Sequence, residues 1–197
     1  MTNISNIVAT LEDSGIHKPS LYRVSIELPS EMDSGWNTVL RNMKPRVHTA
    51  TIPQEEIRTY ERPSHSRTIQ RVVSGRAENE PIMFSVIASN DLRERKLFET
   101  WMDYAVDRHT NMPRFFDKYI GSMKIDLLSV EEGSDDAFEN GRIVSRYHLY
   151  DVFPSGLGEI ELGYANTDEF TTFTVTITYH RWMREDKTSP TGRPDVF

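Results

Sequence analysis

Histidine is the first residue type to examine for metal binding or acid–base chemistry, because its imidazole titrates near neutral pH. The six histidines of the chain are His17, His48, His65, His109, His148 and His180. None lies in a His-Glu-x-x-His segment or another spacing typical of metal ligands. His148 and His180 fall on predicted strands and could be close in space, but neither has a carboxylate or second histidine beside it at ligand spacing. We interpret them as ordinary strand residues and expect no metal site.

The glycines, serines and cysteines argue against the common catalytic motifs. None of the ten glycines belongs to a Gly-x-x-x-x-Gly-Lys or Gly-x-Gly-x-x-Gly phosphate loop, and no serine lies in a Gly-x-Ser-x-Gly elbow. The glycine-rich run 154–158 joins two predicted strands and is interpreted as a turn. The chain has no cysteine, which excludes disulfides, thiolate zinc sites and cysteine nucleophiles. We therefore expect no cofactor and no enzymatic activity.

Two charged clusters remain as candidate binding sites. Carboxylates gather at Glu131, Glu132, Asp135, Asp136 and Glu139. They could hold calcium, but the EF-hand spacing is absent and a solvated loop is favoured. The run 114–119 interleaves basic and aromatic residues, which could stack the bases of a single strand. The alternative, which the acidity of the chain favours, is a link between a helix and a strand whose aromatic side chains fill the core.

Composition restricts the class of protein further. The chain has 197 residues, of which 37% are hydrophobic and 10% aromatic, enough for the core of one domain. Its net charge of −7 argues against general binding to nucleic acid, although an acidic chain can still carry a local basic patch. No segment approaches the ~18 apolar residues that span a bilayer. The first 14 residues lack the features of a secretory signal, so we expect neither export nor a membrane anchor.

The hydrophobic pattern has a period of two along most of the chain, which predicts a mainly β fold. Expected strands cover 20–28, 82–88, 123–127, 142–151 and 172–182. In the last of these, Phe173, Val175 and Ile177 alternate with threonines, which are good strand formers on a half-exposed face. We expect an antiparallel β-sandwich or partial barrel.

One helix is predicted between these strands, at 91–108. Asp91 is placed to cap its first turn, with Glu94 completing a pair that resembles a capping box. Leu97, Phe98, Trp101, Met102 and Ala105 form a single apolar stripe. Trp101 is expected to anchor this stripe in the core together with Phe84 and Phe173. A ligand-stacking role for Trp101 is the less favoured alternative.

The segment 55–75 has strand-forming residues with weak alternation, and a Pro-Ser-His-Ser turn lies near its middle. A long two-stranded ribbon is marginally stable in water, so we expect it to pair with other chains. A mobile polar loop is the alternative. The residues expected at such contacts are Arg58, Tyr60, Arg62, Arg67, Ile69 and Arg71. We treat 1–184 as a single domain and 185–197 as an extended C-terminal tail.

Several segments, taken in order, resemble the tail tube protein family of contractile-tailed (myovirus-type) bacteriophages. The opening run Lys18-Pro19-Ser20-Leu21-Tyr22-Arg23-Val24-Ser25-Ile26 is similar to that family's first strand, and Phe98-Glu99-Thr100-Trp101 to its short helix. Further matches are Ile52-Pro53 with the strand 82–87, the run 150–162, and the run 169–182 ending in Trp182. In the run 150–162, Asp151 stands where the family usually has glycine. The matches are collinear over roughly 15–183.

The resemblance implies six-membered rings that stack into a tube, with strands of all six subunits forming one barrel around the lumen. A sheath and a baseplate would be the protein partners, and genomic DNA would pass through the lumen during ejection. Such a protein belongs in the virion, after assembly in the host cytoplasm. The ribbon arginines are then expected to pair with carboxylates, such as Glu55, Glu56 and Glu61 or those of neighbouring subunits. A tube initiator or baseplate paralogue, a DNA- or cell-wall-binding module, and a baseplate lysozyme remain as alternatives.

Overall fold

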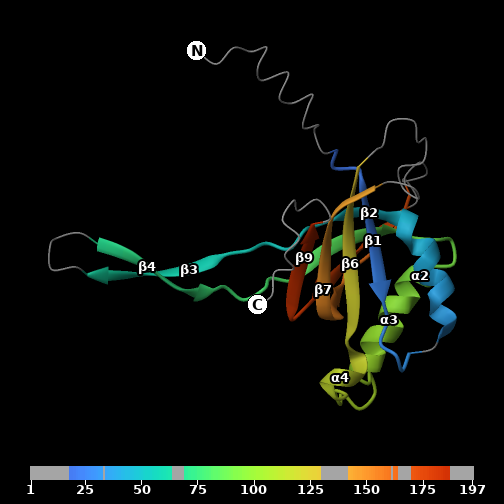
Figure 1. Ribbon diagram of the computed structural model, residues 1–197. Coiled ribbons are helices and arrows are strands. Elements are labelled where there is room, and N and C mark those ends of the chain that lie inside the picture. Colours follow the sequence, from blue (N-terminus) through green and yellow to red (C-terminus); the bar gives the residue numbers. More distant parts are fainter. Residues whose placement is uncertain are drawn as a thin grey trace, which may run out of the picture.

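A computed structural model describes residues 18–32, 34–63, 69–129, 142–160, 162–163 and 170–186. The fold is mainly antiparallel β, as the sequence predicts, and the main sheet does not close into a barrel within these residues (Figure 1). The acidic cluster at 131–139, His17, His65 and Arg67 lie outside the described residues, as does the tail beyond residue 186.

The main sheet curls into two layers around the core. The first layer has the order β1 (Tyr22–Glu27), β6 (Gly121–Ser129), β7 (Arg142–Leu157) and β9 (Arg181–Asp186). The second layer has the order β7, β8 (Thr172–Thr178), β5 (Ile82–Ile87) and β2 (Val47–Ala50). The strand β7 belongs to both layers. The alternating apolar residues of each layer point inward and are buried, because they face one another across the core.

The change of layer takes place at Asp151 on β7. Its φ of +55° lies in the left-handed region, which suits glycine and which aspartate tolerates better than most residues. Up to Tyr150 β7 pairs with β6 and β9, Val152 still pairs with Gly121 of β6 after the register shift at Asp151, and from Phe153 onward β7 pairs with β8. The position at which the resembling family usually has glycine is therefore one where the backbone requires an unusual conformation.

Two sequence predictions about this region are wrong. The run 154–158 is not a turn, because residues up to Leu157 continue β7 along β8. Gly156 permits this close approach, since a Cβ there would lie 3.2 Å from the Cβ of Thr176. The predicted strand 172–182 is also broken, because β8 ends at Thr178 and β9 begins at Arg181 in the other layer. The crossing is held where the His180 N–H donates to the Tyr150 carbonyl over 3.1 Å.

Helices cover the side of the sandwich near β1 (Figure 1). The predicted helix forms as α3 (Arg93–Ala105), which is shorter than 91–108 because Val106 is already extended. A second helix, α2 (Asn37–Met43), lies between the 3-10 turns η1 (Ser34–Trp36) and η2 (Lys44–Arg46) and was not predicted. It is short and has no side-chain cap, so the sequence carries no helix signal there. A one-turn helix, α4 (Phe116–Tyr119), precedes β6.

The predicted cap of α3 is wrong. The chain enters the helix through Leu92, whose φ is +50°, and Asp91 pairs with Arg93 instead of capping. Leu92 is the N-cap and makes no side-chain cap hydrogen bond, while the hydroxyl of Ser89, three residues earlier, accepts a hydrogen bond from the N–H of Arg93 over 3.4 Å. The buried carboxylate of Glu94 in turn accepts hydrogen bonds from the hydroxyl and the N–H of Ser89.

The apolar stripe of α3 packs into the core between the layers. Phe98 makes edge-to-face contacts with Phe84 and Phe173, at ring-centroid distances of 5.8 and 6.5 Å. Trp101 is fully buried, and its indole N–H donates to the Tyr119 carbonyl over 2.8 Å. All three residues expected to anchor the core, Phe84, Trp101 and Phe173, are therefore in it.

The ribbon consists of β3 (Ile57–Pro63) and β4 (Ile69–Arg76), which form a separate two-stranded antiparallel sheet. It projects from the body on the side of β9, away from α2 and α3 (Figure 1). Within the described residues, no helix is long and apolar enough to cross a membrane.

Candidate functional site

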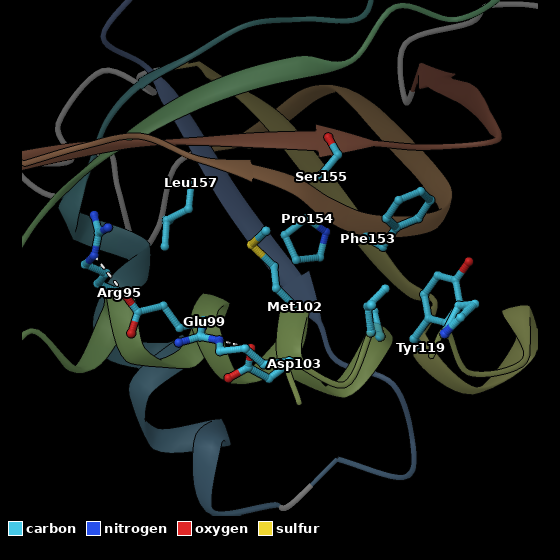
Figure 2. Close-up of a pocket in the computed structure, with 13 residues that line it drawn as sticks. Arg95, Glu99, Met102, Asp103, Tyr119, Phe153, Pro154, Ser155 and Leu157 are labelled. Carbon is cyan, nitrogen blue, oxygen red and sulfur yellow. Dashed lines mark hydrogen bonds and ion pairs between the residues drawn. The ribbon is translucent and has the colours of Figure 1, made fainter. Parts of the chain in front are cut away.

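The described part of the chain holds no group of three or more histidine and acidic side chains that could bind a metal. A groove of ≈ 600 Å³ lies between α3 and the second half of β7 (Figure 2). Met102, Phe153 and Leu157 make its lining mainly apolar. The carboxylates at its rim belong to ion pairs, Glu99 with Arg95 and Asp103 with Arg108, each at 3.0 Å. The groove therefore offers a packing surface rather than a pair of free acid–base groups.

The basic and aromatic run 114–119 does not fill the core. Phe115 is 83% exposed and Phe116 is 49% exposed, so the expectation that these rings are core residues is wrong. They lie at the turn into α4, where the chain reverses at the end of α3, and this reversal directs them outward. Arg114 stacks on the ring of Tyr104 at 4.2 Å.

Both faces of the ribbon mix apolar and charged side chains. Strand alternation places Ile57, Ile69 and Val73, each more than half exposed, on the face that also carries the Glu61–Arg71 ion pair. The opposite face carries Arg58, Tyr60 and Arg62, all exposed. The described body of the chain covers neither face, so the ribbon leaves both apolar and cationic groups open to another molecule.

Most of the ribbon arginines have acidic neighbours. Arg71 pairs with Glu61 at 3.4 Å, as the sequence suggests. At the base of the ribbon Arg76 pairs closely with Glu55. Arg58 approaches Glu78 at 4.0 Å, a partner that the sequence did not suggest, because the β-ladder brings the two together across 20 positions. The ribbon is thus less basic than its arginine content implies.

A second candidate surface is the outward face of the first layer, which sequence reasoning missed. Its charged residues alternate across the strands. Asp126 on β6 forms ion pairs with Arg23 of β1 at 3.0 Å and with Arg146 of β7 at 2.6 Å. Glu27 pairs with Lys124 in the same way, at 2.6 Å. Only the cross-strand register shows that these side chains are neighbours, and a single sequence does not contain that register.

Asp126 is almost completely buried although it lies on this polar face. Burial by itself raises the pKa of its carboxyl, but hydrogen bonds from Arg146 and Arg23 outweigh this and hold the pKa below its ordinary value. The carboxylate is therefore ionised at neutral pH and offsets one of the two arginine charges. Acidic and basic side chains alternate on this face, so it is not a uniformly basic patch.

The comparisons with known proteins agree with a structural role. The family described as "Phage tail tube protein" matches residues 17–185. The chain belongs to this tail tube protein family. No curated protein matches the sequence significantly.

Solved structures support the fold of this tail tube protein. A chain of the PVC sheath–tube complex, from an extracellular contractile injection system in the extended state, superposes with a TM-score of 0.60 at 12% identity, covering 94% of this chain and 99% of that one. The PVC sheath/tube terminator gives 0.58 at 11% identity, covering 87% and 97%. The tube-terminating cap of the anti-feeding prophage gives 0.57 at 13% identity, covering 87% and 92%. At these identities the likeness is one of fold.

Proposed function

We propose that this chain is a non-enzymatic building block of the inner tube of a contractile tail, assembled as six-membered rings that stack. The observation that carries the proposal is the ribbon of β3 and β4, which extends away from the body, pairs with no other strand in the described part of the chain and exposes apolar side chains. An isolated two-stranded sheet of this kind is marginal in water, so contacts with other copies would stabilise it. Family membership supports the same conclusion.

The ribbon lies on the side of β9 and extends beyond the sandwich, where a neighbouring subunit would stand (Figure 1). Its exposed arginine, Arg62, forms no ion pair within the described residues and is available to a carboxylate of another copy. We expect Arg58, Tyr60, Ile69 and Arg71 to contribute to the same contact, and Arg67 with them. Sheath and baseplate proteins would bind the finished tube, as the solved sheath–tube complex of the PVC system indicates for its own tube.

Genomic DNA is the proposed cargo, and it must pass without binding. The polar face of the first layer suits such a wall, because its acidic and basic side chains alternate and pair with one another instead of forming a continuous basic surface. Purified tubes should then bind duplex DNA weakly at low salt. Tight binding that falls steeply with salt would instead indicate that unpaired arginines bind the DNA phosphates, and it would favour the alternative function of a nucleic-acid-binding module.

The test of tube formation is negative-stain electron microscopy and sedimentation of the purified chain over a range of concentrations. A variant without residues 56–74 should retain the circular dichroism and cooperative unfolding of the body but form no rings. Phe115→Ala, at an exposed site away from the ribbon, is the matched control and should assemble normally. A deletion variant that still builds rings would show that the ribbon is a mobile loop.

The same images separate the main tube protein from a paralogue. A tube subunit should stack without limit, whereas an initiator or baseplate paralogue should stop at single rings or short stacks. The likeness to a tube terminator and a tube-terminating cap makes this second outcome a specific alternative.

A further inference from the structure

The first layer of the sandwich ends on two open edges. Within the described residues, β1 pairs only with β6 and β9 pairs only with β7. The four strands are antiparallel throughout, so β1 and β9 run in opposite directions. Exposed strand edges tend to pair with another chain unless they are blocked. If a second copy continues the layer, β9 of one copy therefore meets β1 of the next as an antiparallel pair.

The polar and apolar faces restrict the register of this pair. On β1 the polar face carries Arg23, Ser25 and Glu27, while Tyr22, Val24 and Ile26 point to the core side. On β9 the residues that share this polar face are Arg181, Met183 and Glu185. A shift of one residue would turn a polar side chain toward the core side. Only registers that place members of these two polar sets opposite one another are allowed.

Charge selects one register from this set. When Met183 stands opposite Ser25, Glu185 stands opposite Arg23 and Arg181 stands opposite Glu27, which makes two pairs of opposite charge. A shift by two residues in either direction loses both pairs. Arg181 stacks on the Tyr150 ring at 4.8 Å, and neither Arg181 nor Glu185 forms an ion pair within the described part of the chain. Both are therefore available to a neighbouring copy.

The selected register also continues the pattern that already exists within one copy. Cross-strand neighbours there follow the row Arg23, Asp126, Arg146, Glu185, in which positive and negative charges alternate. Placing Arg23 of a second copy after Glu185 keeps this alternation unbroken across the junction. A second row runs Glu27, Ser122, Tyr150, Arg181 and would likewise continue into Glu27 of the next copy.

We propose that neighbouring subunits of a ring join through antiparallel pairing of β9 with β1, with Met183 opposite Ser25 and with Glu185–Arg23 and Arg181–Glu27 ion pairs at each junction. This rests on the proposed function, and it specifies which edges meet and in which register. The face that carries these rows then becomes continuous from copy to copy. The partner is a second copy of this chain.

The absence of native cysteine allows a direct test. In the double variant Ser25→Cys/Met183→Cys the two thiols of one chain are three strand spacings apart, about 14 Å, too far for an intramolecular disulfide. Opposed positions in an antiparallel pair fall within disulfide range. Mild oxidation of assembled protein should therefore give a ladder of covalent multimers on denaturing gels. Leu21→Cys/Met183→Cys, displaced by four residues and leaving both proposed ion pairs intact, is the matched control and should crosslink at least about tenfold more slowly.

A second measurement does not depend on disulfide geometry. Arg181→Glu places two carboxylates opposite each other at the junction, which should raise the concentration needed for assembly by about tenfold or more at low salt. High salt should reverse much of this loss because it screens the repulsion. Phe115→Ala, at an exposed site away from the junction, should assemble as the natural chain does. An Arg181→Glu variant that assembles normally at every salt concentration would contradict the proposed ion pair.

The outcomes separate the two levels of proposal. If the natural chain forms rings or tubes but the Ser25/Met183 pair does not crosslink, or crosslinks no faster than the displaced pair, the register is wrong and the tube function stands. If the natural chain forms neither rings nor tubes, the proposed function fails and the junction fails with it. A multimer ladder that ends at six chains supports both.

Discussion

Replacement of Trp101 is the most direct test of how α3 is attached to the sheets. The side chain is fully buried, and its indole N–H donates to the Tyr119 carbonyl at the start of the turn into β6. Its ring also lies against the backbone at Gly121, where a Cβ would come within 3.0 Å of the indole. The residue therefore fills space between α3 and β6 and satisfies a backbone acceptor at the same time.

The expected cost follows from these two roles. Truncating a buried large aromatic residue to alanine costs about 3–5 kcal/mol. The lost hydrogen bond leaves the Tyr119 carbonyl without its donor, which places Trp101→Ala toward the upper end of that range. Trp101→Phe keeps most of the apolar contact but loses the donor, so we expect about 1–3 kcal/mol. The difference between the two variants separates packing from hydrogen bonding.

The assay is urea unfolding followed by circular dichroism at a concentration where the chain is monomeric. Phe115→Ala is the control, because this ring is exposed and its loss should change the free energy of unfolding by less than about 0.5 kcal/mol. A Trp101→Ala variant as stable as the natural chain would refute the reasoning. It would mean that Trp101 is exposed in solution and free to meet another subunit or the sheath.

Two further predictions concern single carboxylates. Asp126→Asn should destabilise the body by about 2–3 kcal/mol, because Arg23 and Arg146 lose the charge that balances them. The folded-state pKa of Asp126 is depressed, so its contribution is present above the unfolded value of about 4 and is lost as the pH falls. Unfolding measured from pH 6 to pH 3 should therefore show a smaller loss in the variant, and equal losses would contradict this account. Asp151→Gly should be tolerated within about 1 kcal/mol, whereas Asp151→Val should cost about 1–2 kcal/mol because its φ is positive; thermal unfolding of both variants checks the order.

The strands and the main helix were predictable from the sequence because burial imposes a period on them. Phe173, Val175 and Ile177 alternate with threonines, and Leu97, Phe98 and Trp101 form a helical stripe. Each of these patterns reports contact with one core. The ends of the elements were less predictable. Asp91 does not cap α3, because the positive φ of Leu92 makes Leu92 the N-cap, and Ser89 instead accepts a hydrogen bond from the N–H of Arg93.

The assembly surfaces show the limits of sequence reasoning more clearly. The ribbon was found because its arginines and strand formers stand in a segment that no core explains. The row of Arg23, Asp126 and Arg146 was missed, because its members are far apart in sequence and meet only through the strand register. Phe115 was misplaced because aromatic residues usually mark a core, and a local run cannot show which way a turn directs them.

The strand β7 also has a mechanical consequence. It passes without interruption from one layer to the other at Asp151, and the link from β8 to β9 crosses back beside it, fastened by the His180–Tyr150 hydrogen bond. Two layers joined twice by covalent backbone cannot slide over one another as two stacked sheets can. Layers that cannot slide resist bending more strongly than layers that can. We therefore expect the two layers of the subunit to deform together when force is applied along or across them.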